Sequence, residues 1–191
     1  MTPAALFVFC AAVRAYEDGL FSLIYGRLVY YGADKAILGQ RPILVFGGGA
    51  MKAFAFQGCT SLVAVVSRGH GHIGPFAFRG CTSLVSVAFG PGLKHIGDLA
   101  FWGCTSLASV TVNPGLESIG DSAFYACTSL ASVTFNPGLK AIGQAAFWGC
   151  TSLASVTFNP GLKTIGRAAF WGCTSLVDIT FNPDLERISD Y

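Results

Sequence analysis

Apolar and polar residues follow one another in the same order along most of the chain, in segments of about 23 residues. In one segment, residues 155–158 read SVTF and alternate between polar and apolar, the pattern of a strand with one buried face. Asn159-Pro160-Gly161 ends this strand, because proline cannot donate to a ladder and glycine tolerates a turn. Residues 162–166 are predicted to form a second extended arm, and residues 167–171 a short helical or 3₁₀ turn. The side chains expected to point inward are Leu153, Val156, Phe158, Leu162, Ile165, Phe170 and Cys173.

The segments are close copies of one another. Residues 127–149 and 150–172 differ only where Ala141 is replaced by Thr164 and Gln144 by Arg167. The block AFxGC recurs six times, once with Ala126 in place of the glycine, and the first interval is one residue shorter than the others. Self-similarity at a fixed period is typical of solenoids, in which each coil buries its apolar side against its neighbours. We therefore predict a mainly β solenoid of six coils over residues 54–191, with a looser first coil.

Residues 16–53 do not follow the repeat. Two apolar runs, residues 20–25 and 28–31, flank Gly26-Arg27 and predict a β-hairpin. A third apolar run, residues 42–46, ends at three glycines. Because the end of a solenoid exposes its core, we predict that residues 16–53 form an N-terminal cap.

The two ends of the chain allow more than one interpretation. Residues 1–15 contain a ten-residue apolar run and small residues that suit a cleaved signal peptide. A first buried segment, or a start codon inside a longer array, fits the same residues. At the other end, a polar closing coil would explain the charges of Asp178, Asp184, Glu186, Arg187 and Asp190. A truncated gene would equally explain the abrupt end at Tyr191.

The repeated run IGxxAFxGCTSLxSVxFNPGL resembles the BspA-like leucine-rich repeats, and the resemblance covers residues 54–191. It implies a curved, right-handed solenoid with a parallel sheet on one face and short helical or 3₁₀ turns. It also implies protein binding or adhesion, since such repeats are common in surface proteins of bacteria and protists. A secreted or cell-surface location is therefore favoured. Residues 16–53 depart from the pattern, so the resemblance does not extend to them.

Composition narrows the possible functions. Hydrophobic residues make up 52% of the chain and charged residues 12%, with a net charge of +2. So small a charge gives no reason to expect nucleic acid or an anionic membrane as a partner. No apolar run reaches the roughly 18 residues that a membrane-spanning helix needs. The chain has no GxSxG, HExxH or phosphate-binding glycine loop, so we predict neither an enzyme nor a cofactor.

One cysteine recurs in each of the six repeats, and there is no CxxC pair. Zinc sites usually take paired ligands a few residues apart. Stacked side chains would point in parallel, which is poor geometry for a disulfide. We therefore interpret the six thiols as small buried apolar groups.

The strand face is the first candidate binding surface. A parallel sheet in a solenoid offers an open polar surface, and its uniformity would suit a repetitive protein or glycan ligand. The alternative is that these are solvated small residues, since a specific protein site normally has aromatic and arginine anchors. The predicted site residues are Ser109, Thr111, Asn113, Ser132, Thr134, Asn136, Ser155, Thr157 and Asn159.

An aromatic stripe is the second candidate, formed by Trp102, Tyr125, Trp148 and Trp171. Each follows a buried phenylalanine and is therefore expected to be outward or half-buried. The stripe is either ladder packing between coils or an exposed surface for a partner, a glycan or self-association.

Three histidines form the weakest candidate. His72 and His95 occupy the same position in adjacent coils, and His70 is close in sequence. Three imidazoles could hold a metal ion, but no carboxylate clearly joins them, so we predict no metal site. The function predicted overall is non-catalytic binding of a macromolecule, including adhesion at a cell surface. The alternative is a structural module that self-associates through the aromatic stripe.

Overall fold

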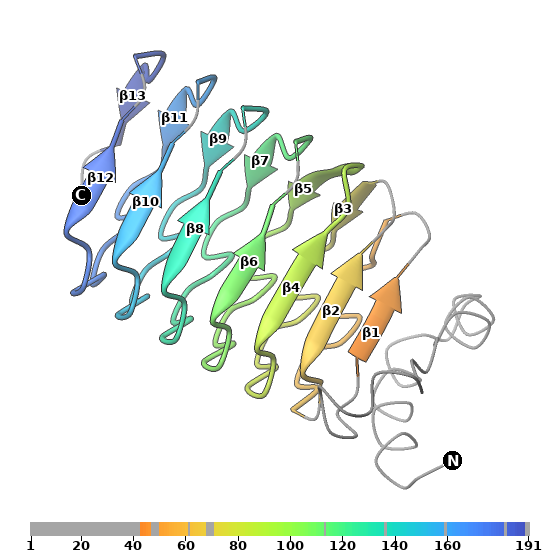
Figure 1. Cartoon of the computed structure of the whole chain (residues 1–191). Helices are drawn as coiled ribbons and strands as arrows, with labels where there is room; N and C mark the ends of the chain where they lie inside the picture. Colours follow the sequence, from red (N-terminus) through yellow and green to blue (C-terminus); the bar gives the residue numbers. More distant parts are fainter. Residues whose placement is uncertain are drawn as a thin grey trace, which may run out of the picture.

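The computed structural model describes residues 43–46, 50–60, 62–67, 71–112, 114–135, 137–158, 160–181 and 183–189. The predicted signal segment and the predicted hairpin lie outside these residues. Successive coils stack along one axis and form two sheets whose strands all run parallel (Figure 1). The prediction of a mainly β solenoid is therefore confirmed.

The first sheet has seven strands in the order β1-β2-β4-β6-β8-β10-β12. Each strand pairs with its own counterpart one coil away, so that Val110, Val133 and Val156 lie in register. Its strands are β1 (Ile43–Phe46), β2 (Ala64–Ser67), β4 (Ser86–Phe89), β6 (Ser109–Thr111), β8 (Ser132–Thr134), β10 (Ser155–Thr157) and β12 (Asp178–Thr180).

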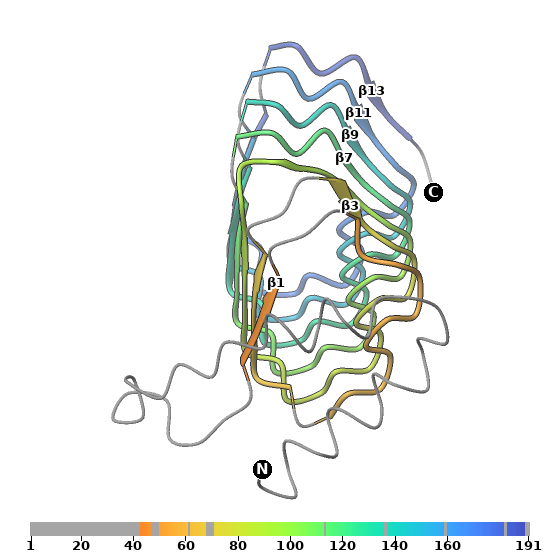
Figure 2. The ribbon, with the colours of Figure 1, turned by 90° about the vertical axis from the view of Figure 1, so that its right-hand side faces the viewer.

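The second sheet has six shorter strands in the order β13-β11-β9-β7-β5-β3. It is the second extended arm that the sequence predicted. In Figure 2 the two sheets and the turns between them enclose one continuous interior. The strands are β3 (Gly71–Ile73), β5 (Leu93–Ile96), β7 (Ser118–Ile119), β9 (Ala141–Ile142), β11 (Thr164–Ile165) and β13 (Arg187–Ile188).

Both sheets include residues that precede the predicted array. Strand β1 pairs in parallel with β2, in a register from Ile43 opposite Ala64 to Phe46 opposite Ser67. Met51 forms a parallel bridge with Ile73 of the second sheet. The parallel stacking thus begins before Phe54, inside the segment from which we expected a cap.

A register shift absorbs the short first interval. Gly71 is opposite Leu93, whereas the next residue, His72, is opposite His95. Lys94 therefore has no counterpart in the preceding strand. The missing residue is accommodated at this irregularity, and Ile73 again pairs with Ile96.

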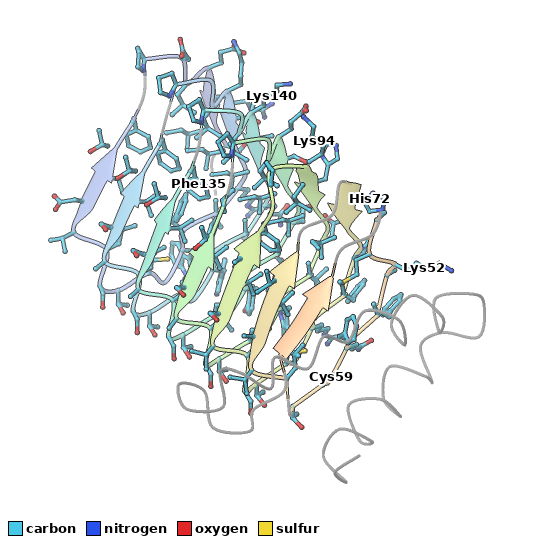
Figure 3. All side chains as sticks on the ribbon, turned by 45° about the vertical axis from the view of Figure 1, so that its right-hand side comes forward. Lys52, Cys59, His72, Lys94, Phe135 and Lys140 are labelled. Atoms are coloured by element: carbon cyan, nitrogen blue, oxygen red, sulfur yellow. The ribbon has the colours of Figure 1, made fainter. Side chains whose placement is uncertain are left out.

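The interior consists of columns of like side chains. In one coil Val156 and Phe158 are 2% and 5% exposed, whereas Ser155 and Thr157 face solvent, as the alternation predicted. The phenylalanines of the AFxGC block stack across coils, with ring centroids 5.1–5.2 Å apart between residues 78, 101, 124 and 147. Figure 3 shows Phe135 among the side chains that fill this interior.

The repeated cysteines lie in this core as free thiols, and all but Cys173 are fully buried. Each thiol from Cys81 onward donates a hydrogen bond to the carbonyl of the phenylalanine in the preceding coil, for example Cys150 Sγ to Phe124 O at 3.2 Å. Burial raises the pKa of the Cys150 thiol to about 12. A buried thiol that stays protonated at neutral pH is a poor nucleophile.

The return segment differs from its prediction. Residues 167–172 form consecutive turns, with Trp171 N–H donating to Ala168 O at 3.0 Å, instead of a helical or 3₁₀ segment. Positive φ angles at Ala168 (53°) and Gly172 (74°) interrupt any right-handed helix. The equivalent turns of successive coils are joined by further hydrogen bonds, such as Phe101 N–H to Ala123 O at 2.7 Å. The described part of the chain contains no helix able to span a bilayer.

The last coil leaves apolar side chains uncovered. Phe181 and Ile188 are 49% and 54% exposed, whereas their counterparts one coil earlier, Phe158 and Ile165, are 5% and 4% exposed. Phe181 stacks on Phe158 through one ring face, with centroids 5.8 Å apart.

Prediction from the turn geometry: replacing Ala126 with glycine stabilises the protein. Ala126 has φ 57°, and the five equivalent positions are glycines with φ of 70–74°. An L-residue in this region costs about 1 kcal/mol. Ala126→Gly should raise the melting temperature by roughly 2–4 °C in calorimetry. The matched substitution Gly149→Ala, with room for a Cβ but φ 70°, should lower it by a similar amount. Equal melting temperatures for all three proteins would contradict this account.

Candidate binding surfaces

The predicted strand-face residues come together on the seven-stranded sheet. Ser109, Ser132 and Ser155 lie opposite one another on β6, β8 and β10. Thr111 and Thr134 pair in the same way, and Thr157 follows on β10. All six side chains are exposed. Asn113, Asn136 and Asn159 lie outside the described residues.

The exposed side chains of β6, β8 and β10 are small and uncharged. A parallel strand spacing of about 4.8 Å repeats each hydroxyl from one coil to the next. The flanking strands change this chemistry: Ala88 replaces the threonine on β4, and Asp178 replaces the serine on β12. The uniform hydroxyl surface is therefore confined to three strands.

One exposed column beside the hydroxyls was missed by the sequence analysis. Ala108, Ala131 and Ala154 precede the three serines and are exposed. Val85 (38% exposed) and Val177 (82%) continue the column at either end. The sequence could have shown this column, because each alanine recurs between a buried leucine and an exposed serine in the repeat. The strand face thus combines methyl groups with hydroxyl groups.

The four residues of the aromatic stripe form one stack. Centroid distances are 6.0 Å for Trp102–Tyr125, 6.0 Å for Tyr125–Trp148 and 5.7 Å for Trp148–Trp171. The Arg79 guanidinium lies 4.6 Å from the Trp102 centroid and covers that end of the stack. The first three rings are half-buried, whereas Trp171 is 46% exposed.

This geometry is that of ladder packing. The interplanar angles of 17° and 12° in the first two pairs direct the ring faces toward each other. A sugar or a cation recognised by an aromatic residue usually lies over a ring face. The facing rings of these pairs are therefore already in contact, and the Trp148–Trp171 pair is tilted by 34°. The role of the stripe in binding stays a prediction.

A column of charges crosses the second sheet. Lys94 Nζ and Lys140 Nζ lie 2.8 and 2.9 Å from the two carboxylate oxygens of Glu117. Lys163 pairs with Glu186 in the last two coils. The side chains are one-third or more exposed, so each pair adds little to stability.

Two of the three histidines are adjacent. His72 and His95 are opposite each other on β3 and β5, whereas His70 lies outside the described residues. His95 Nδ1 is 2.8 Å from Ser118 Oγ on β7. Among the described residues no group of three or more His, Cys, Asp or Glu side chains is arranged to hold a metal ion.

The sequence repeat matches a known family model. The model of the BspA type leucine rich repeat region matches six copies over residues 50–176. The chain belongs to the BspA-type leucine-rich repeat family. Leucine-rich repeat proteins of this type generally bind other proteins, and the resemblance seen in the sequence is confirmed.

Solved bacterial structures share this BspA-type fold. A leucine rich repeat protein of T. pallidum is 33% identical, with a TM-score of 0.62, over 68% of this chain and 72% of that one. A leucine-rich repeat protein from Bacteroides ovatus is 28% identical, with a TM-score of 0.65, over 78% of this chain and 42% of that one. A leucine rich cell surface protein from Faecalibacterium prausnitzii, 24% identical with a TM-score of 0.51, covers 74% and 42% and supports the fold alone. No match was found among curated protein sequences.

Prediction from the charge column: the benefit of Glu117 disappears in acid. Hydrogen bonds from Lys94 and Lys140, together with their charges, lower the pKa of Glu117 from 4.5 to about 2. Because the folded-state pKa is below the unfolded one, this stabilisation is present above pH 4.5 and is lost as the pH falls toward 2. Thermal melts of the wild type and Glu117→Gln should therefore differ at pH 6 and converge near pH 2. High salt should reduce the difference at pH 6. A difference that stays constant across this pH range would refute the assignment.

Proposed function

We propose that this BspA-type solenoid is a non-catalytic binding module whose strand face captures another macromolecule. The observation that supports this proposal is the alignment of exposed Ser and Thr side chains on β6, β8 and β10. Solenoids commonly bind through such an extended surface. The exposed alanines beside the hydroxyls add apolar contact area to the same face.

The uniformity of the face favours an extended, repetitive ligand. A ligand that moves by one coil meets the same hydroxyl and methyl groups again. An extended protein segment or a neutral glycan would tolerate this repetition, whereas a compact protein epitope normally requires distinct anchors. The cell surface is the setting in which such ligands are common, and we propose adhesion there as the biological role.

Prediction for the strand face: Thr111→Arg, Thr134→Arg and Thr157→Arg together abolish ligand capture. Three stacked arginines would fill the surface and add charge where the face has none. Retention should fall at least about tenfold on a panel of purified extracellular-matrix proteins and on a glycan array, consistent with the loss of more than 1.4 kcal/mol.

The matched control places three stacked arginines on the other sheet, at Ser118, Ala141 and Thr164. These positions are also in register across adjacent strands, so the control reproduces the charge repulsion without touching the strand face. It should bind like the wild type. If the strand-face variant still binds its ligand, the proposed site is wrong.

Self-association is a second candidate, favoured by a specific observation. Trp102, Tyr125, Trp148 and Trp171 form one stack, and Trp171 is 46% exposed. Exposed apolar surface of this kind is typical of contacts between proteins. A second copy of the chain would cover the outward edges of these rings if the two aromatic stripes met.

Prediction for self-association: Trp171→Ser lowers the oligomeric state. The substitution removes the exposed end of the aromatic stripe while leaving the three stacked rings in place. Multi-angle light scattering after size exclusion should show a shift toward monomer, with at least about a tenfold weaker dimer. Trp102→Ser, at the end covered by Arg79, is the control and should leave the distribution unchanged. An unaltered oligomeric state in Trp171→Ser would count against this candidate.

A further inference from the structure

The paired histidines result from the register shift in the first coil. Without that shift His72 would be opposite Lys94, but the irregularity after Gly71 moves it opposite His95. Both side chains are exposed on the outer face of the second sheet. Figure 3 shows His72 and Lys94 on this outer side, away from the interior that holds Phe135. Two imidazoles therefore project into solvent from adjacent strands.

A neighbouring hydroxyl orients one of these imidazoles. Ser118 Oγ lies 2.8 Å from His95 Nδ1, which leaves Nε2 as the other ring nitrogen available for coordination. Histidines that bind metals nearly always form a hydrogen bond through their second ring nitrogen, which fixes the tautomer and the ring direction. His95 already has this supporting contact.

The charges around the pair do not prevent a cation from binding. Lys94 is the adjacent residue on β5, and its ammonium group is 2.8 Å from a Glu117 carboxylate oxygen. This ion pair offsets the positive charge beside the histidines. The thiols from Cys81 to Cys150 do not compete for the same ion, because they are buried in the core.

We propose that His72 and His95 form a binding site for an exchangeable divalent transition-metal ion. Imidazole suits zinc, copper and nickel. Metal–nitrogen bonds of about 2.0–2.1 Å require the two nitrogens to be roughly 3 Å apart. Parallel strands are about 4.8 Å apart, so an ion held by both residues requires the His72 side chain to turn toward His95. Water completes the coordination and leaves positions open to a further ligand.

This site is separate from the strand face. The two histidines lie on β3 and β5 of the second sheet, whereas the hydroxyl columns lie on β6, β8 and β10 of the first. Metal binding and macromolecule binding can therefore be measured independently. If the metal site is not found, the proposed binding function of the strand face is unaffected, and the reverse also holds.

Nickel titration tests the site, because Ni²⁺ binds imidazole without oxidising the thiols. Isothermal titration of the untagged full chain should show one ion per chain. His72→Ala and His95→Ala should each weaken binding at least about tenfold. Ser118→Ala should weaken it by about tenfold through loss of the supporting hydrogen bond. Circular dichroism and thermal melts establish that each variant is folded.

A control with an unchanged number of histidines tests the pairing itself. The double variant His72→Ala with Thr164→His keeps three histidines but places the new one three strands away from His95. It should bind no better than His72→Ala alone. Wild-type affinity in this variant would overturn the proposal. So would loss of binding in His70→Ala with full binding in His72→Ala and His95→Ala.

Discussion

The whole structure depends on how closely successive coils approach one another. A Cβ placed on Gly143 would lie 2.6 Å from the backbone nitrogen of Asp121, and one on Gly166 would lie 2.5 Å from that of Gln144. At these two positions, which follow the buried Ile142 and Ile165, an added side chain would overlap the backbone of the preceding coil. The glycines therefore allow the backbones to meet at the spacing that the two sheets require.

At that spacing, the side chains of each coil pack against the equivalent side chains of the next coil. A phenylalanine ring stacks on the equivalent phenylalanine, and a thiol reaches the carbonyl of the coil before it. Backbone hydrogen bonds join the coils through both sheets and through the return turns. Each coil therefore covers core residues of its neighbours: Phe158, which stacks between Phe135 and Phe181, is 5% exposed.

Much of this arrangement could be predicted from the sequence, because burial follows the repeat. Alternation at residues 155–158 correctly gave the buried and exposed positions of β10. The return turns were harder, because residues with left-handed φ include Leu99, Ser122 and Ala145, which carry no common local preference for that region. On the strand face, the positions of the hydroxyls could be predicted, but the exposure of Ala131 could not, since an alanine suits either side of a strand. The choice of ligand depends on chemistry outside the chain.

The irregularity between Gly71 and His72 shows how such an array tolerates changes in length. One residue is missing from the first interval, yet Ile73 and Ile96 are paired correctly two positions later. Since every coil takes its register from its immediate neighbour, an insertion or deletion stays local and does not displace the coils beyond it. Gene duplication can therefore lengthen this protein, and small deletions can alter a single coil, without each event having to preserve the fold of the whole. Substitutions can therefore change the exposed residues of one coil without altering the structure of the other coils.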